Sequence, residues 1–353
     1  MFGLKKTSKE LVGVDIGSSS VKAVQLKKKG RSFELASLGL AEVSPDSVVD
    51  GAIMDALSVS SAIQKVFTDN RIEASQVATS VSGSAVMVKR ITVPVESEEE
   101  LDEAVPSEAQ RQLSSDPSEL NLDYQLLGPA LAPKALDVML VAARREKVSG
   151  YTGVLSQAGK TPMVVDVDVF ALQNAFENSY EPPPDQIFAL LNVGASLTNV
   201  NIVRNGVPLF TRDIAVGGSL YTEALRKAFD LSFEEAETVK LGGEHPKVTA
   251  EQRNSTLQSV SANVVAELRR TFNFFNQLTD AGSVDRIYLA GGTARLAGLA
   301  ERMQDELKIP VEILDPLRRI GVPASGFDPE YVASLAPRLT VAVGLALRSF
   351  DNP

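Results

Sequence analysis

Two segments of this chain place a glycine and small hydroxyl side chains at the turn between two short apolar strands. Residues 14–26 read Val-Asp-Ile-Gly-Ser-Ser-Ser-Val-Lys-Ala-Val-Gln-Leu, and residues 191–203 read Leu-Asn-Val-Gly-Ala-Ser-Leu-Thr-Asn-Val-Asn-Ile-Val. Three positions align between them, in order: Asp15, Gly17 and Ser19 with Asn192, Gly194 and Ser196. Such turns offer backbone amides to an anion, so two related halves that repeat the hairpin are expected to share one phosphate ligand.

The first hairpin carries the groups that a triphosphate with magnesium requires. Its turn supplies main-chain amides and three hydroxyls, and glycine lets a phosphate approach without a Cβ in the way. A lysine after the turn is placed to meet the β- and γ-phosphates, and an aspartate before it to hold the water shell of Mg2+. The members of this candidate site are Asp15, Gly17, Ser18, Ser19, Ser20 and Lys22. A hydroxyl-rich turn with one glycine is also a common surface turn, so both interpretations stay open.

Three further motifs favour the same ligand. One is the second turn, one is a glycine pair that opens a helix, and one is a glycine pair that follows a strand. Their members are Gly194, Ser196 and Thr198; Gly217 and Gly218; and Gly291, Gly292, Thr293 and Arg295. The first amides of a helix attract anions. Each glycine pair is by itself an ordinary turn or helix-entry device, so the nucleotide interpretation depends on the set.

Strand and helix patterns alternate along both halves, which predicts an α/β fold with mostly covered sheets. The stiff segment Glu-Pro-Pro-Pro-Asp at 181–185 precedes the second hairpin and predicts a domain boundary. We therefore expect a first lobe over 1–185 and a second over 186–353. A more polar texture at about 85–162, with an acidic helix start, predicts a small inserted domain, and helical patterns mark about 219–280.

Composition excludes several classes of protein. The 353 residues carry a formal net charge of −10, which argues against nucleic acid as the main partner. There is no cysteine and a single histidine, so neither a disulfide framework, a cysteine nucleophile nor a typical zinc site is expected. No stretch reads as a membrane span, and residues 1–6 lack the apolar core of a signal peptide, which predicts a cytoplasmic protein.

The set of motifs resembles the actin-like (ribonuclease H-like) ATPase fold, in matching order along the whole chain. Residues 15–22 resemble its first phosphate motif, 191–198 its second and 289–295 its adenosine motif. Glu237 and Lys240 resemble the helix pair that contacts adenine and ribose in FtsA-like members, although a solvated helix face has the same pattern. The resemblance implies ATP and Mg2+ as ligands.

Within that fold the insertion at about 85–162 resembles the small SHS2-type domain of FtsA and its relatives, not the extra lobe of actin. FtsA carries an amphipathic membrane-targeting helix at its end, which this sequence does not show. The first hairpin, Val-Asp-Val-Asp-Val-Phe-Ala-Leu at 165–172 and Leu-Asp-Pro at 314–316 are more similar to the PilM family of type IV pilus assembly proteins.

That family resemblance implies a cytoplasmic ATP-binding scaffold at the inner face of the inner membrane. It implies that the N-terminal tail of PilN binds in a groove between the first lobe and the inserted domain, that membrane contact is made through this partner, and that the pilus motor ATPases and self-association are further contacts. The alternative is an FtsA-like division protein that polymerises under the membrane. A small-molecule kinase of the same fold is a third reading, but the sequence identifies no base for it.

The second phosphate motif departs from that of efficient hydrolases. Asn192 stands where such enzymes carry an aspartate, so Asp15 is left as the one catalytic candidate. Removing a positioned charge typically slows phosphoryl transfer by orders of magnitude, so we expect tight ATP binding with weak or absent turnover. Asp166 and Asp168 lie where the fold sometimes orients water, but the simpler expectation is that they cap the following helix.

Overall fold

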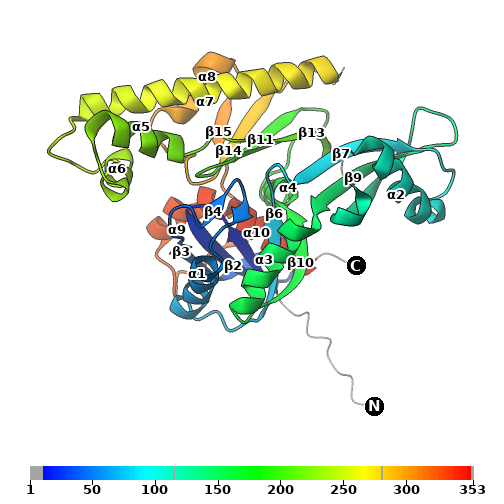
Figure 1. Ribbon diagram of the computed structural model, residues 1–353, viewed down its shortest axis with the longest axis horizontal. Helices are drawn as coiled ribbons and strands as arrows, with labels where there is room; N and C mark the ends of the chain where they lie inside the picture. The colour runs from blue at the N-terminus through cyan, green and yellow to red at the C-terminus, as the bar shows by residue number, and fades with distance from the viewer. Residues whose placement is uncertain (1–10, 114–115, 280, 351–353) are drawn as a thin grey trace, which may run out of the picture.

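The computed structural model describes residues 11–113, 116–279 and 281–350, so the opening segment 1–6 lies outside the described residues. The first lobe is built on a six-stranded sheet in the order β10–β6–β1–β2–β3–β16 (Figure 1). Its strands are β1 (Val12–Ile16), β2 (Ser20–Lys29), β3 (Ser32–Glu42), β6 (Gln76–Val81), β10 (Thr161–Val167) and β16 (Ile320–Gly321). The short pair β4 (Val48–Val49) and β5 (Ala52–Ile53) precedes helix α1 (Ala56–Asp69). As the alternating pattern predicts, β1, β2 and β3 form an antiparallel meander.

The second lobe repeats this plan on a five-stranded sheet in the order β13–β12–β11–β14–β15. Its strands are β11 (Phe188–Val193), β12 (Thr198–Arg204), β13 (Val207–Ile214), β14 (Arg286–Ala290) and β15 (Val311–Ile313). Helices α5 (Ser219–Phe229), α6 (Phe233–Lys240), α7 (Ala250–Leu278) and α8 (Leu299–Leu307) belong to this lobe. The helical pattern after Gly218 is divided because Asp230 adopts a left-handed conformation (φ 50°) and Ser232 caps the next helix.

The inserted domain projects from the first lobe as a three-stranded sheet with one helix (Figure 1). It consists of β7 (Val86–Val93), α2 (Leu101–Gln112), β8 (Leu120–Pro129) and β9 (Leu136–Arg144), and its own apolar core is closed by Leu101 and Val105. The following helix, α3 (Arg145–Gln157), packs with Tyr151 and Leu155 in the core of the first lobe. The insertion therefore ends at Arg144, earlier than the predicted boundary near 162, because the apolar face of α3 is covered by the first lobe.

The C-terminal segment departs from the predicted boundary in the other direction. Residues 186–353 were expected to form the second lobe, but β16 pairs with β3 of the first sheet. After α9 (Pro329–Leu335) and the short 3-10 turn η3 (Ala336–Leu339), helix α10 (Thr340–Leu347) is buried along its whole length. A helix that is apolar on every side needs cover on every side, and here the first sheet and helix α4 (Asp168–Ser179) provide it.

Of the described residues, Pro329–Leu347 is long and apolar enough to cross a membrane, which corrects the expectation that no stretch reads as a span. In this structure 67% of its apolar window is buried inside the protein. The segment therefore serves as core.

Two glycines set how closely α10 lies to its neighbours. A Cβ added to Gly13 of β1 would lie 2.0 Å from the carbonyl oxygen of Ala342, and one added to Gly344 would lie 1.8 Å from that of Ala171 in α4. Real Cβ atoms do not approach backbone oxygens so closely. The helix is thus held between strand and helix at contact distances that only glycine allows.

We expect Gly344→Ala and Gly13→Ala each to lower the free energy of unfolding by about 1–3 kcal/mol or more, because the added methyl group overpacks backbone against backbone. Urea unfolding measures this. Gly150→Ala on α3 is the matched control, since no atom lies within 4 Å of its added Cβ. That control should raise stability by about 0.5–1 kcal/mol. A Gly344→Ala protein as stable as the unmodified chain would contradict this packing.

Candidate functional site

The turn between β1 and β2 brings Asp15 and Lys22 together. The two residues face each other in the antiparallel register, and Lys22 Nζ lies 3.1 Å from Asp15 Oδ2. Their side chains are only 14% and 12% exposed, so the pair is largely withdrawn from water. A Cβ on Gly17 would lie 2.8 Å from Lys22 Nζ, so glycine is what lets the ammonium lie over the turn. The geometry presents a cation and a carboxylate beside exposed backbone.

The serines of this turn differ in their surroundings. The Gly17 N–H donates to the carbonyl oxygen of Ser20 at 3.1 Å, which closes the turn and leaves Ser19 exposed. Ser20 is 1% exposed, and its Oγ has no hydrogen-bond partner among the described residues. A buried hydroxyl usually has a partner, so this orphan is consistent with a polar ligand at the turn. The residues present fit a phosphate group.

The second turn, between β11 and β12, is held by helix α5. The N–H groups of Gly218 and Ser219 donate to the carbonyl oxygens of Gly194 and Ala195 at 2.9 and 2.8 Å. These two amides were expected to take an anion, and the structure corrects that expectation because the turn already occupies them. A Cβ on Gly217 would lie 2.5 Å from the Ala195 oxygen, so this glycine serves close packing.

Two predicted hydroxyls also brace the turns. Thr198 Oγ1 donates to the carbonyl oxygen of Val216 at 2.7 Å, and Thr293 Oγ1 donates to that of Gly194 at 2.9 Å. Both threonines are buried. Their hydroxyls are therefore committed to the backbone. Gly194 is committed as well, because its N–H donates to the carbonyl oxygen of Leu197 at 2.9 Å, so the predicted member of the second turn left for a ligand is Ser196.

The glycine motif after β14 is locked onto the same turn. A Cβ on Gly291 (φ 95°) would lie 2.3 Å from the carbonyl oxygen of Val193, and the Gly291 N–H donates to the carbonyl oxygen of Pro337 at 2.8 Å. Glycine is needed here for both conformation and approach. This motif thus joins β11, β14 and η3.

Glu237 and Lys240 form part of a polar network at the start of α5. Lys240 Nζ lies 2.5 Å from Glu237 Oε1 and donates to Thr222 Oγ1 at 3.0 Å. The Thr222 hydroxyl donates in turn to Glu237, and Lys240 reaches the Gly218 carbonyl oxygen at 3.5 Å. The structure therefore places this predicted pair next to the glycines that back the second turn, rather than on an isolated solvated face.

Two arginines belong to the region of the third glycine motif, and the sequence predicted only Arg295 as a site residue. Arg295 is exposed and donates to the carbonyl oxygen of Ala333 on α9 at 2.9 Å, so it is directed away from the phosphate turns. Arg338 was missed. Its Nε lies 3.7 Å from the position of a Cβ on Gly292 and has no hydrogen-bond partner among the described residues. Only the fold brings this guanidinium, from η3, beside the glycine motif.

Acidic side chains gather between the two lobes. Asp168, half-buried at the start of α4, accepts a hydrogen bond from Ser80 Oγ at 2.5 Å. Burial raises its pKa to about 6, and the negative charges of Asp15 and Asp213 act in the same direction. The expectation that Asp166 and Asp168 cap α4 is wrong, because no side chain caps that helix. Asp213 on β13 was missed by sequence reasoning, since a single aspartate in a strand carries no signal.

Lys147, in the first turn of α3, is a second cation that the sequence did not indicate. Its ammonium donates to the carbonyl oxygen of Ser82. Burial lowers its pKa, while the carboxylates of Asp168, Asp213 and Asp50 act against that shift. The charge of the acidic cluster is thus partly neutralised from the start of α3, where the chain returns from the inserted domain.

Within the described ranges no three histidine or acidic side chains are arranged to hold a metal ion by themselves. A magnesium ion at this site would therefore be held mainly by phosphates and water, with Asp15 as the protein's contribution. This is the coordination that Mg2+ prefers with nucleotides.

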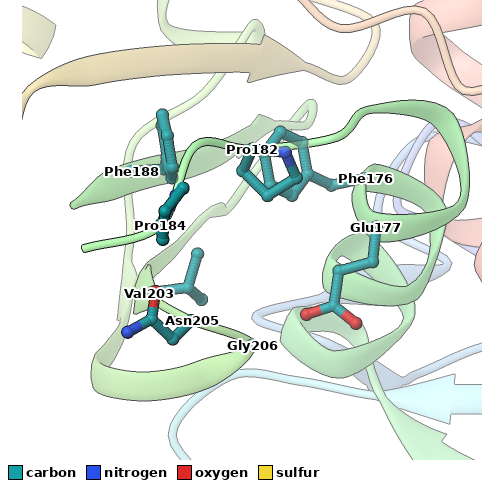
Figure 2. A pocket seen from close by; sticks show the side chains of 8 residues that line it. All are labelled: Phe176, Glu177, Pro182, Pro184, Phe188, Val203, Asn205 and Gly206. Atoms are coloured by element: carbon teal, nitrogen blue, oxygen red, sulfur yellow. The ribbon is translucent and has the colours of Figure 1, made fainter. Parts of the chain in front are cut away.

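A cavity of ≈330 Å3 lies away from all these residues, where α4 leads into β11. Figure 2 shows Pro182 and Pro184 of the lobe-to-lobe connection among the residues that line it, together with Phe176 and Phe188. None of the predicted site residues lines this cavity. Prolines of the connection and aromatic side chains form its wall, and it is separate from the candidate site.

The pH dependence of stability tests the environment of Asp168. Its pKa is raised from 3.8 to about 6, so the folded state binds the proton more tightly than the unfolded state. Stability is then lost as pH rises from 4 to 6, by about 2–3 kcal/mol.

In Asp168→Asn this loss is absent. We therefore expect the stability of the variant, relative to the unmodified protein, to increase by that amount between pH 4 and 7 in urea unfolding. Asp305→Asn, exposed on α8, is the control. A difference between Asp168→Asn and the unmodified protein that is constant with pH would contradict the assignment.

The overall structure resembles solved proteins with the actin-like ATPase fold. The ethanolamine utilization protein EutJ from Carboxydothermus hydrogenoformans is 18% identical, with a TM-score of 0.55, and the match covers 96% of this chain and 89% of that one. MreB5 of Spiroplasma citri bound to AMPPNP is 12% identical, with a TM-score of 0.52, covering 95% and 94%. These likenesses confirm the predicted fold class.

Sequence and structure together identify the family. A cell division protein FtsA from Streptococcus pneumoniae is 24% identical, covering 88% of this chain and 76% of that protein. The structure titled as the PilM–PilN type IV pilus biogenesis complex contains a chain 31% identical to this one, with a TM-score of 0.86, covering 97% and 99%. The model of the family described as type IV pilus assembly protein PilM matches residues 13–350. The chain belongs to the PilM family of type IV pilus assembly proteins.

Proposed function

We propose that this protein is a cytoplasmic ATP-binding scaffold that holds the N-terminal tail of PilN and links the inner-membrane part of the pilus machinery to its motor ATPases. A role in type IV pilus assembly follows from the family. The observation that supports the finer proposal is the likeness, over nearly the whole of both chains, to a PilM chain from a PilM–PilN complex.

The nucleotide would lie between the two phosphate turns. The amides of Ser18 and Ser19 and the ammonium of Lys22 are placed to take the β- and γ-phosphates, with Ser196 facing them from the second lobe. Bound magnesium would neutralise phosphate charge, and Asp15 would hold its water shell. Glu237 and Lys240 would contact the adenosine, near the start of α5.

The same geometry favours slow hydrolysis. Asn192 is neutral, and its amide donates to Asn199 Oδ1 at 2.8 Å, so it is part of a structural chain of hydrogen bonds. The charge that would anchor a second metal-bound water is therefore missing, which typically costs orders of magnitude in rate. We infer weak or absent ATPase activity, with ATP acting as a ligand that sets conformation.

The PilN tail would bind as an extended peptide between the first lobe and the inserted domain. β10 is an edge strand of the first sheet and exposes Met163, while β7 and β8 are the edges of the inserted sheet. Main-chain hydrogen bonds to such an edge supply affinity, and side-chain pockets supply specificity. A partner anchored in the inner membrane would place this protein at the inner face of that membrane, without a membrane contact of its own.

For the nucleotide, Lys22→Met should weaken the affinity for Mg·ATP by about 10- to 100-fold, because it removes a charge-assisted hydrogen bond to phosphate. Isothermal titration calorimetry measures this. Lys27→Met is the matched control, since Lys27 lies on the same strand with its side chain exposed. Equal affinities of the two variants for Mg·ATP would show that Lys22 does not bind the nucleotide.

For the partner, a synthetic peptide of the N-terminal cytoplasmic residues of PilN from the same organism should bind the Mg·ATP-loaded protein with micromolar or tighter affinity. Calorimetric titration gives the affinity, and a peptide of scrambled sequence is the control. No binding by protein shown to be folded and nucleotide-loaded would overturn the proposed partner and favour a division-type role.

A further inference from the structure

The inserted domain joins the first lobe through two chain crossings that are tied to each other. The chain leaves the lobe after β6 and returns where β9 runs into α3. The N–H of Arg144 donates to the carbonyl oxygen of Ala85 at 3.0 Å, and the ammonium of Lys147 donates to that of Ser82. A change at one crossing therefore acts on the other.

Gly83, in the outgoing crossing, lies close to the second phosphate turn. A Cβ added to Gly83 (φ 88°) would lie 2.8 Å from the carbonyl oxygen of Asp50. The same Cβ would lie 3.4 Å from Leu197 Cδ1 and 3.4 Å from Lys147 Nζ. Leu197 lies in the turn that begins at Gly194. The base of the inserted domain thus lies so close to a turn of the candidate nucleotide site that a single methyl group at Gly83 would touch it.

A chain of hydrogen bonds runs from the end of β11 to the same glycine. The amide of Asn192 donates to Asn199, and the amide of Asn199 donates to Asp213 Oδ1, each at 2.8 Å. Asp213 Oδ2 accepts the Gly83 N–H at 2.5 Å. Both oxygens of Asp213 are used in this way. The carboxylate therefore connects the second lobe to the base of the inserted domain.

Lys147 completes this arrangement by charge. Asp50, Asp168 and Asp213 face its ammonium, and Asp168 in turn faces Asp15 beside Lys22. An added phosphate charge, or a displacement of Lys22 from Asp15, changes the field at the carboxylates that Lys147 balances. A second route thus runs from the first phosphate turn to the incoming crossing.

We propose that Asp213 and Lys147 are positioning residues of a clasp, formed with Ser82 and Gly83, that couples nucleotide binding to the inserted domain and so to partner affinity. The proposal rests on the proposed function, because it takes Mg·ATP and the PilN peptide as its two ligands. A nucleotide that draws on both phosphate turns acts on the bonds and charges that hold the base of the inserted domain. By linkage, bound peptide then changes the affinity for ATP by the same factor as bound ATP changes the affinity for the peptide. In typical cases this factor is about 5- to 150-fold.

Hydrogen exchange tests the clasp without the partner. Backbone exchange in residues 82–93 and 136–144 is measured with and without saturating Mg·ATP, saturation being verified by titration for each variant. We expect ATP to change exchange in these segments several-fold in the unmodified protein. We expect Asp213→Asn and Lys147→Met to abolish the ATP dependence, since an amide cannot accept both hydrogen bonds and methionine carries no charge.

Lys134→Met is the matched control, because Lys134 lies in the inserted domain with its side chain 75% exposed, away from the clasp. It should keep the full ATP dependence. An unmodified protein whose inserted domain is insensitive to ATP, or variants that keep the ATP dependence, would overturn the proposal. If Asp213→Asn does not fold, Lys147→Met alone tests the proposal.

The partner gives the second readout. The PilN peptide affinity of the unmodified protein should differ at least 5-fold between the ATP-loaded and nucleotide-free states, and by less than 2-fold in the two clasp variants. Failure of the proposed function would appear as absence of ATP or peptide binding by the unmodified protein. Failure of the clasp would appear as normal binding of both ligands with no coupling, or with coupling that the variants retain.

Discussion

The packing of α10 between β1 and α4 is the constraint on which the rest of this structure depends. Gly13 and Gly344 remove the side chains that would otherwise separate strand, helix and helix. The three elements fixed in this way each lead to the site. β1 runs into the turn of Asp15, α4 begins at Asp168, and η3, just before α10, receives the N–H of Gly291. Two close contacts in the core thus set the positions of groups from both lobes.

The glycines and hydroxyls of the site divide into two kinds according to what they contact. One kind holds one turn against another. Gly217 and Gly291 allow backbone to approach backbone, and the hydroxyls of Thr198 and Thr293 donate to backbone carbonyl oxygens. Gly17 and Ser20 surround a half-buried ion pair and an orphan hydroxyl. The residues bonded to backbone hold the turn after β11 in place. Those around the ion pair leave polar groups for a ligand. In the function proposed above, a second turn held by the backbone would face a first turn whose polar groups take the nucleotide.

Much of this could be predicted from the sequence because it is local. Strand alternation and turn glycines indicate the two hairpins, and the order of the motifs indicates the fold. The lobe boundaries could not be predicted in the same way. An all-apolar helix such as α10 carries no sign of which sheet it covers, and the helical pattern of α3 does not tell on which domain its face is buried.

The charged residues of the site that the sequence did not indicate share one property. Only long-range packing brings them to the site. Asp213 and Lys147 lie in strand and helix segments that carry no site motif, and their charges act on each other only because the fold brings these segments together. Arg338 comes to Gly292 only because η3 returns to the first lobe. Conversely, Arg295 follows directly on the glycine motif, yet the chain directs its guanidinium to α9.

The most direct test of the central claim is a crystal structure of this protein grown with Mg2+ and AMPPNP. We expect triphosphate density between the turns at Gly17 and Gly194, with Lys22 moved from Asp15 onto a phosphate oxygen and Asp15 facing a water on the metal. A nucleotide bound elsewhere, or a Lys22–Asp15 pair that stays intact beside bound phosphates, would contradict it.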